Sequence, residues 1–519
     1  MIRHVVFQPS NRSIGVPDGT LVSDAAKQAG VWIDSPCGGN GTCKKCGVTL
    51  IAGGKEETVL ACQTKVETDC VVRTTSESEI VTLSSASARA VTFAPYTRTA
   101  AYPDGACFAA FDLGTTTIVC YLLDAKSGRQ IAVHGMQNPQ TAFGADVIAR
   151  AAYALENSAN PLRVSAASGL NRLLGKVCRI AGKTPEQVVL ISIVGNTVMH
   201  HLLLGYPVDA LARAPYEPYR SEKLILPAKE LGLAAHESCE VLLPPVIGGY
   251  VGADTVACMS ATAFDTLLEP TFLIDIGTNG ELALTDGQKI AVCATAAGPA
   301  FEGANISCGM RAIDGAIEHF SLEDGRLLCR VIGGGEPAGI CGSGLIELVS
   351  LLCQTGAVDE TGLLRQNGCL SDRVVQTQTG VRAFRIAGEG NDALLLTQKD
   401  IRELQLAKAA MRAGVETLIG VLSLRPEQIK EVLLAGAFGA HLSPDALFGV
   451  GLLPGGLSGR VKSIGNAAGE GAKAYLRNFE LFQQSEALAE SADYIELTDS
   501  DTFSECFIEA IAFPEKGAN

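Results

Sequence analysis

One local design occurs twice in the chain, and it constrains the fold more than any other feature. An apolar strand pattern runs into Asp112-Leu113-Gly114-Thr115-Thr116 and continues into a second, β-branched strand. The same order of strand, Asp-x-Gly-Thr turn and strand recurs at Asp275-Ile276-Gly277-Thr278-Asn279, about 160 residues later. A single turn of this kind fits any β-hairpin, but two copies at this separation indicate an internal duplication. We therefore expect two related halves.

Both turns have the residue types that a nucleotide phosphate site needs. Glycine lets a phosphate approach the backbone, and backbone N–H and hydroxyl groups donate hydrogen bonds to it. An aspartate beside them can hold Mg²⁺ through water molecules. We therefore expect a nucleotide with Mg²⁺ here, with catalytic residues Asp112, Asp275 and Glu281. The phosphate contacts are expected from Gly114, Thr115, Thr116, Gly277, Thr278 and Asn279.

A third glycine turn follows a buried apolar strand pattern at 432–435. An adenosine would lie against its residues Gly436, Ala437 and Gly439. The ordered set of three turns, with connecting segments at 194–201 and 464–472, resembles the actin, Hsp70 and sugar-kinase superfamily. The resemblance implies an α/β fold in which two ribonuclease-H-like halves clamp ATP in a cleft and hinge on its hydrolysis.

Smaller features of this region leave some alternatives open. The glycine-rich segments 297–310 and 339–346 either line the cleft or are turns that need positive φ. Thr397 offers an N-cap to a helix that we expect to run through about Gly420. Because His200 and His201 are adjacent, their side chains leave a helix or strand on different sides, and we expect structural histidines rather than a metal pair. A last strand is expected at 494–497.

The N-terminal part of the chain carries four cysteines in a pattern typical of iron–sulfur proteins. They are Cys37, Cys43, Cys46 and Cys62, with five, two and fifteen residues between them. Clusters need thiolate ligands, and the glycines between the first three cysteines let the loop fold over the sulfides with its N–H groups directed at them. We predict a [2Fe-2S] cluster on these cysteines. A zinc site fits the last gap less well, because zinc usually takes paired CxxC or CxxH units, and a disulfide framework is the other alternative.

The pattern around the cysteines is hairpin, helix, cluster loop and strand, which resembles the β-grasp ferredoxin fold. The expected helix is 19–30 and the expected strands are 2–7, 13–16, 46–51 and 70–74. We take residues 1–83 as this domain. Residues 84–106 are rich in Ser, Ala and Thr and form a linker. It is either a flexible coil with a root-mean-square span of roughly 25 Å or a strap packed on the next domain through Phe93 and Tyr96.

Composition excludes several classes of function. The net charge of −15 argues against a nucleic-acid partner, because phosphate binding needs a basic face. Most of the 17 cysteines are scattered singly, as expected of buried thiols in a reducing compartment. No signal-peptide core and no long uncharged apolar run is present, so we expect a cytoplasmic protein without a membrane segment.

The combination of a cluster module, a linker and a nucleotide cleft closely resembles the reductive activators of corrinoid proteins, over essentially the full length. The motifs that carry the resemblance are DIGTNGE at 275–281, GPAFEGANIS at 298–307, LTQKDIR at 396–402 and LAGAFG at 434–439. The resemblance implies an ATP-hydrolysing enzyme that passes an electron from its cluster to a corrinoid (cobalamin-containing) protein and returns Co(II) to Co(I) for methyl transfer.

The same resemblance implies further properties. They are an anaerobic source, a homodimer, a middle domain at 107–205 and an ATPase domain at 206–519. It also implies an upstream electron donor such as a ferredoxin, a flavodoxin or a reductase. Two other classes of function stay open at this point. One is a small-molecule kinase of the same superfamily, and the other is a redox-sensing or electron-delivery protein that binds ATP without hydrolysing it.

Overall fold

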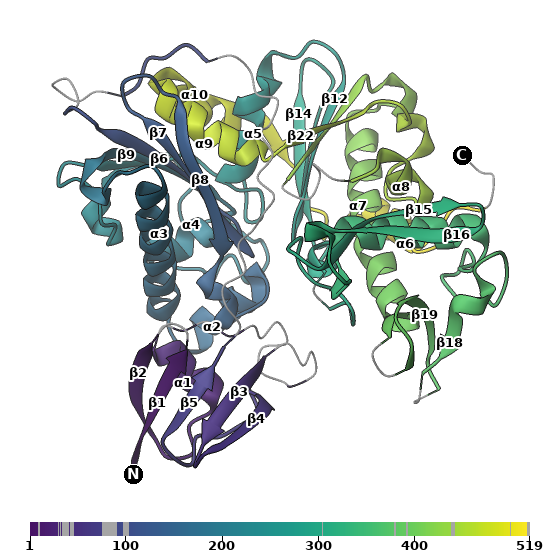
Figure 1. Ribbon diagram of the computed structural model, residues 1–519. Coiled ribbons are helices and arrows are strands. Elements are labelled where there is room, and N and C mark those ends of the chain that lie inside the picture. The colour runs from purple at the N-terminus through teal and green to yellow at the C-terminus, as the bar shows by residue number, and fades with distance from the viewer. Residues whose placement is uncertain are drawn as a thin grey trace.

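The computed structural model contains a small N-terminal domain and two larger α/β halves that lie side by side (Figure 1). The described residues are 1–8, 11–29, 31, 33, 41, 46–74, 91–96, 103–303, 305–377, 380–390, 393–436, 442–498 and 500–515. None of the helices in these ranges has the length and hydropathy that a membrane crossing needs.

The N-terminal domain is a five-stranded sheet with one helix against it. The strand order is β2-β1-β5-β3-β4, and Val5 and Phe7 of β1 are fully buried in its core. The expected strands and helix are present, but β4 is an addition. Its sequence, Lys-Glu-Glu-Thr-Val-Leu, is largely exposed at the sheet edge and lacks apolar alternation. The elements are β1 (Ile2–Gln8), β2 (Arg12–Pro17), α1 (Val22–Ala29), β3 (Gly47–Ala52), β4 (Lys55–Leu60) and β5 (Cys70–Arg73).

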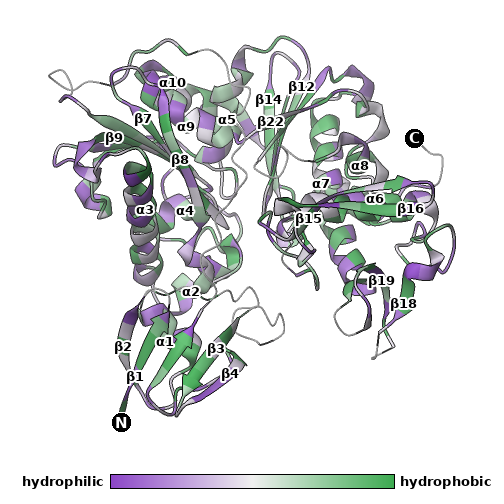
Figure 2. Cartoon of the chain, viewed as in Figure 1, coloured by the Kyte–Doolittle hydropathy of each residue, from purple (hydrophilic) through white to green (hydrophobic). Residues whose placement is uncertain are grey.

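The first half is a six-stranded sheet in the order β10-β11-β9-β6-β7-β8. β9 is buried along its whole length because helices cover both faces of the sheet. Figure 2 shows the contrast between hydrophobic β9 and α3, on which hydrophobic and hydrophilic residues alternate. The elements are β6 (Cys107–Leu113), β7 (Thr117–Asp124), β8 (Gln130–Gln137), α2 (Val147–Glu156), α3 (Asn160–Ile180), β9 (Val188–Gly195), α4 (Thr197–Leu204), β10 (Leu224–Pro227), β11 (Glu240–Leu243) and α5 (Ala253–Thr262).

The second half repeats this design. Its main sheet has the order β22-β21-β12-β13-β14-β23, and β12 pairs with β13 and β21 as β6 pairs with β7 and β9. The predicted duplication and α/β class are therefore confirmed. The elements of the main sheet and its helices are β12 (Thr271–Ile276), β13 (Gly280–Thr285), β14 (Ile290–Thr295), α6 (Gly342–Thr355), α7 (Gln398–Val421), β21 (Glu431–Ala435), α8 (Pro444–Gly449), β22 (Val461–Gly465), α9 (Ala467–Arg477), α10 (Phe479–Glu490), β23 (Ala492–Tyr494) and α11 (Asp501–Ala510).

Two smaller sheets extend the second half. They contain β15 (Ala316–Glu323), β16 (Arg326–Val331) and β17 (Gly339–Ile340) in one, and β18 (Val374–Gln376), β19 (Arg382–Ala387) and β20 (Leu394–Thr397) in the other. The helix expected from Thr397 is α7, and Thr397 with Asp400 forms its capping box. The last strand, β23, begins at Ala492 rather than at Tyr494. In the first half, β10 and β11 follow residue 205, so that sheet continues past the domain limit drawn from the sequence.

The two halves share one apolar core. Helices α5, α9 and α10 lie between the two main sheets (Figure 1). The shared core joins Phe108 of β6 and Leu273 of β12 with Met259 of α5 and Tyr475 of α9. The Oγ atom of Ser260 on α5 lies 2.8 Å from the hydroxyl of Tyr475. The halves are therefore joined through packed helices, and the turns that lie beyond these helices face each other.

Part of the linker is a strap rather than a coil. The N–H of Ala94 donates to the carbonyl of Arg477 at 2.7 Å, and the N–H of Phe479 donates to the carbonyl of Ala94 at 3.0 Å. The rings of Tyr96 and Phe479 lie 4.3 Å apart between centroids. Residues 91–96 thus follow the junction of α9 and α10, which confirms the strap alternative for this segment. Residues 84–90 and 97–102 lie outside the described part of the chain.

Candidate functional site

A cavity of about 230 Å³ lies between the two halves, at the ends of β6 and β12. Every described residue that the sequence assigned to the nucleotide site lines it, and their roles stay predictions. These residues are Asp112, Gly114, Thr115, Thr116, Asp275, Gly277, Thr278, Asn279, Glu281 and Gly436. Ala437 and Gly439 lie outside the described residues. The two glycine-rich segments also reach the cavity, through Phe301, Glu302 and Met310 and through Cys341, Gly342 and Ser343.

Close backbone contacts explain the glycines of the turns. A Cβ atom at Gly114 would lie 2.6 Å from the carbonyl oxygen of Thr117, so no larger residue fits. Gly436 has a φ of +98°, and a Cβ there would lie 2.8 Å from Oδ1 of Asp275. The third turn therefore meets the second at its aspartate.

The first turn is held from behind by Arg150 of α2, which the sequence analysis did not single out. Its Nη2 donates to the carbonyl of Thr115 at 2.6 Å, and Asn138 Nδ2 donates to the carbonyl of Gly114 at 2.8 Å. The side chain of Arg150 is fully buried, and burial lowers its pKa to about 9. These bonds fix two carbonyl groups of the turn.

Two asparagines make polar contacts from one half to the other. Asn196 follows β9 and caps α4, and its Nδ2 lies 3.5 Å from Oε1 of Glu281 in the other half. Asn466 follows β22 and caps α9, and its Nδ2 donates to Oδ2 of Asp112 at 2.8 Å. Both come from the connecting segments expected at 194–201 and 464–472, so each half positions an acidic residue of the other.

Four carboxyl groups line the cavity, and their pKa values are all raised. Burial raises the pKa of Asp112 to about 7 and that of Asp275 to about 6. Asp254, in the first turn of α5, has its pKa raised to about 7 by burial and then by the charges of Asp275 and Asp112. Burial also raises the pKa of Glu281. Like charges close together in a poorly hydrated site disfavour ionisation, so the site favours a cation.

Asp254 is the functional candidate that the sequence analysis missed. Its signal was the run Gly248-Gly249-Tyr250-Val251-Gly252 directly before it. A Cβ at Gly252 would lie 2.6 Å from the Cα of Asn196, so glycine lets α5 begin against the first connecting segment. Among the described residues, no three His, Cys, Asp or Glu side chains converge closely enough to hold a metal ion by themselves. A Mg²⁺ ion here would keep water or phosphate ligands, which is its usual preference.

The phosphate turns also meet each other. Thr116 Oγ1 and Thr278 Oγ1 lie 3.1 Å apart, and each hydroxyl donates to Oε2 of Glu302, at 2.7 and 2.8 Å. Glu302 ends a short 3-10 helix, η5 (Pro299–Glu302), between Gly298 and Gly303, whose φ angles are +73° and +75°. Segment 297–310 thus lines the cleft and also contains turns with positive φ.

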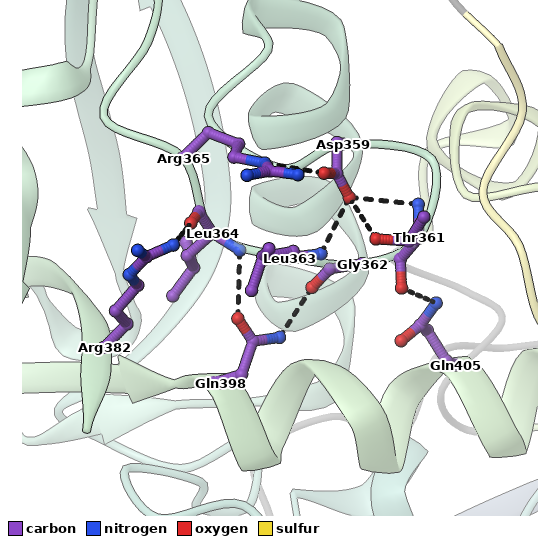
Figure 3. Close-up of polar contacts among 9 residues, drawn as sticks. All are labelled: Asp359, Thr361, Gly362, Leu363, Leu364, Arg365, Arg382, Gln398 and Gln405. Atoms are coloured by element: carbon purple, nitrogen blue, oxygen red, sulfur yellow. Dashed lines mark hydrogen bonds and ion pairs between the residues drawn. The ribbon is translucent and has the colours of Figure 1, made fainter.

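Helix α7 anchors two loops of the second half. Oδ1 of Asp400 accepts from the N–H of Ser307 at 2.8 Å and from its hydroxyl at 3.0 Å, which fixes the far end of the Glu302 segment. From the same helix, Gln398 and Gln405 bind backbone groups of loop 359–365, whose shape Asp359 sets (Figure 3). The cleft segment is therefore attached to a long, well-packed helix.

In the N-terminal domain, the structure describes two of the four predicted cluster ligands. Cys46 and Cys62 are buried, and their sulfur atoms lie 3.2 Å apart without a bond between them. Nε2 of Gln63 lies 3.8 Å from the sulfur of Cys62. Two buried thiols at this separation fit one iron of a cluster, and a nearby amide donor suits its negative charge. Cys37 and Cys43 lie outside the described residues, and none of the described cysteines forms a disulfide.

The structural role expected of the two histidines stays a prediction, and their surroundings keep them neutral. Nδ1 of His201 lies 2.8 Å from the carbonyl oxygen of Thr197, and Nε2 accepts from the N–H of Arg220 at 3.4 Å. His200 is buried, and burial lowers its pKa to about 3. Both side chains are therefore neutral near pH 7.

Comparison with known proteins extends over the whole chain. The family model described as the C-terminal domain of RACo, the ASKHA domain, matches residues 269–519, and that of the RACo middle region matches residues 107–267. The 2Fe-2S iron-sulfur cluster binding domain matches residues 5–67. The corrinoid activation enzyme RamQ of Eubacterium limosum is 31% identical over 584 residues of alignment, which covers 97% of this chain and 98% of that protein. The chain belongs to the corrinoid activation enzymes.

Two more relatives agree with this membership. The [Co(II) methylated amine-specific corrinoid protein] reductase of Methanosarcina barkeri is 28% identical and covers 64% of each chain. The solved structure of a reductive activator for a corrinoid, iron-sulfur protein is 28% identical, has a TM-score of 0.74 and covers 99% of this chain and 98% of that one. The predicted [2Fe-2S] domain and ATP-binding domain are confirmed, and the zinc alternative is wrong.

Proposed function

We propose that this enzyme returns the Co(II) state of a corrinoid protein to Co(I), using ATP and an electron that passes through its [2Fe-2S] domain. The observation that carries this proposal is the presence, in one chain, of a cluster-binding domain and a two-halved cleft whose phosphate turns face each other. The names of the relatives agree, since each refers to the activation or reduction of a corrinoid protein.

The cleft residues divide the work on ATP. Thr116, Thr278 and the backbone of their turns bind phosphate oxygens, and Gly436 leaves room for the adenosine. Asp112 and Asp275 would hold a Mg²⁺ ion, and Asn466 keeps Asp112 oriented. Asp254 and Glu281 sit beside them as carboxylates that can orient the attacking water. Mg²⁺, when bound, supplies the positive charge that neutralises both the acids and the phosphates.

A physical argument explains why ATP and a ferredoxin-like domain occur together. Plant-type clusters have potentials near about −400 mV, and Co(II)/Co(I) is expected to lie lower, so the transfer is uphill. A gap of about 150 mV for one electron corresponds to roughly 3.5 kcal/mol. Differential binding between two conformations supplies free energies of that size. The cross-half contacts of Asn196, Asn466 and Thr116 are what nucleotide binding would rearrange.

Several finer properties belong to this proposal. We expect an external electron donor such as a ferredoxin, a flavodoxin or a reductase, a homodimer, and a cytoplasmic location. The limits 1–83 for the cluster domain and 84–106 for the linker stay predictions as well. The sheet of the first half runs on to β11, past the limit at residue 205 that the sequence suggested between the middle and ATPase domains. The four cluster ligands would be Cys37, Cys43, Cys46 and Cys62.

The test is Asp275→Ala in the full-length protein. Because Asp275 lies at the base of the cleft and far along the chain from the cysteines, the variant should keep the visible spectrum of the cluster. It should lose ATP-dependent Co(I) formation by at least about 100-fold, the usual cost of removing a group that stabilises transferred charge. The measurement is the UV-visible spectrum of a purified corrinoid protein with and without ATP. Glu416→Gln, which removes a partly exposed carboxylate of α7 outside the cavity, is the matched control.

Unchanged Co(I) formation in Asp275→Ala would contradict the proposal. ATP consumption with a small molecule and no corrinoid protein would instead favour a kinase. Intact ATP binding without turnover would favour the electron-delivery alternative.

A further inference from the structure

Glu302 stands where the hydroxyl groups of the two phosphate turns meet. Its Oε2 accepts from Thr116 Oγ1 at 2.7 Å and from Thr278 Oγ1 at 2.8 Å. Thr116 belongs to the first half, whereas Thr278 and Glu302 belong to the second. One carboxylate oxygen of Glu302 therefore accepts a hydrogen bond from each half. We call this pair of hydrogen bonds the bridge between the halves.

These hydroxyl groups are the donors that a terminal phosphate would need. A hydroxyl has a single proton, so it cannot donate to Glu302 and to a phosphate oxygen at the same time. A phosphate bound to the same two hydroxyl groups would also bring negative charge beside the carboxylate, and like charges repel. Glu302 and a terminal phosphate thus exclude each other.

We propose that Glu302 is an internal anion that occupies the terminal-phosphate position between the two turns, and that a nucleoside triphosphate must displace it to bind. The inference rests on the proposed function, since it takes the two turns as the ATP phosphate site. It makes Glu302 a specificity-determining residue, because only a nucleotide whose last phosphate contacts both turns gains the binding free energy that offsets the displacement of Glu302.

The local backbone explains how the side chain can be displaced without unfolding the loop. The Glu302 segment is fixed at one end by the Ser307–Asp400 contact and is kept compact by a close approach of glycines, since a Cβ at Gly309 would lie 2.0 Å from the carbonyl oxygen of Gly303. Phe301, next to Glu302, is fully buried. Displacement therefore moves the Glu302 side chain and breaks the bridge between the halves, while the loop stays attached to α7.

The test compares nucleotide affinities of the full-length protein and of Glu302→Gln by calorimetry. The probes are a non-hydrolysable ATP analogue, ADP and AMP, each with Mg²⁺. Removing the charge should tighten binding of the ATP analogue by about tenfold or more, since hydrogen bonds to a charged group no longer compete. Binding of AMP should not change. Glu416→Gln, which removes a carboxylate outside the cavity, should leave all three affinities as they are.

Unchanged or weaker binding of the ATP analogue in Glu302→Gln would overturn the inference, because it would make Glu302 a spectator or a ligand of the nucleotide complex. If Glu302→Gln fails to fold, Glu302→Ala decides, since it also removes the carboxylate and should show the same sign.

A second measurement follows the bridge itself. Hydrogen exchange of the turns 113–117 and 276–280 should be faster in the variant than in the wild type without nucleotide, and equal once the ATP analogue is bound. Equal exchange in the two proteins without nucleotide would count against the inference.

Co(I) formation by the wild type with ATP, measured on the same sample, separates a failure of the proposed function from a failure of the role of Glu302. If it occurs while the affinities do not differ, only the role of Glu302 fails, whereas a wild type that binds no ATP overturns the proposed function and this inference together.

Discussion

At the scale of single residues, the cleft is a set of acids that protonate unusually easily. Asp112 and Asp254 have pKa values raised to about 7, and Asp275 to about 6, in each case chiefly through burial. An acid whose pKa is higher in the folded than in the unfolded chain binds more protons when folded. Without a cation, the ionisation of these groups therefore lowers the free energy of unfolding as pH rises from about 4 to 7. Above that range all three groups are ionised in the folded protein, and the loss of stability is complete.

This protonation predicts a pH dependence of nucleotide binding with opposite signs for two ligands. Mg²⁺-ATP needs the acids of the cleft in their ionised form. Below pH 6 its affinity should therefore fall about tenfold per pH unit for every proton that these acids must release on binding. ATP without Mg²⁺ brings only negative charge and should bind better at pH 5.5 than at pH 7.5. Calorimetry at several pH values, with Mg²⁺ or with a chelator, checks this. A Mg²⁺-ATP affinity that stays level from pH 5.5 to 7.5 would show that the acids do not face the metal.

At the scale of elements, α5 and α9 pack closely where they cross between the two halves. Gly471 of α9 lies against the backbone of α5, and a Cβ there would lie 2.1 Å from the carbonyl oxygen of Ala257. Gly469, two residues earlier, faces the ring of Tyr121 in the first half. Small residues let these helices approach closely, so the shared core remains one packed unit while the turns beyond it rearrange.

Gly471→Ala should destabilise the protein by about 1–3 kcal/mol, because the added methyl group overlaps the backbone of α5. Gly175→Ala is the matched control. Gly175 lies within α3, and no atom beyond the neighbouring backbone of its own helix lies within 4 Å of its ideal Cβ position, so alanine there should stabilise the protein by roughly 0.5–1 kcal/mol. Denaturant unfolding of the two variants measures both effects. Two variants of equal stability would mean that the helices separate readily at their crossing.

At the scale of the whole molecule, the chain consists of a cluster domain and a two-halved ATPase, and the strap at 91–96 is bound to the ATPase. Ala94 and Tyr96 hold it to the junction of α9 and α10 by two backbone hydrogen bonds and a ring contact. Residues 91–96 of the linker are thus held on the helices that lie between the two main sheets.

Removing residues 1–83 should leave ATP binding intact and end Co(I) formation, because the ATPase core does not depend on the cluster domain for its packing. Removing residues 1–96 should in addition lower stability by about 1–3 kcal/mol, since the Tyr96–Phe479 contact and the strap hydrogen bonds are lost. Thermal unfolding and the Co(II) reduction assay measure the two effects. A shortened protein that still makes Co(I) would refute the assignment of the electron path, and equal stability of the two shortened proteins would show that the strap is held only weakly.

Much of this protein is determined by local sequence. The Asp-x-Gly-Thr turns, the capping box at Thr397 and the cysteine spacing depend on residues a few positions apart, so their chemistry is visible in the sequence. The duplication of the two turns then predicts the paired sheets. The charged edge strand β4 was not predicted because an exposed edge leaves no apolar pattern.

Only the tertiary structure decided which distant segments meet. The glycines near Asp254 and Glu302 are visible in the sequence, but these two acids join the site only because α5 begins and η5 ends at the same cavity as the two turns. The reciprocal contacts of Asn196 and Asn466 likewise depend on how the halves face each other. The same reason applies to residues 91–96. Their composition fits a flexible coil and a packed strap equally well, and the contact with the distant ring of Phe479 shows that they form a strap.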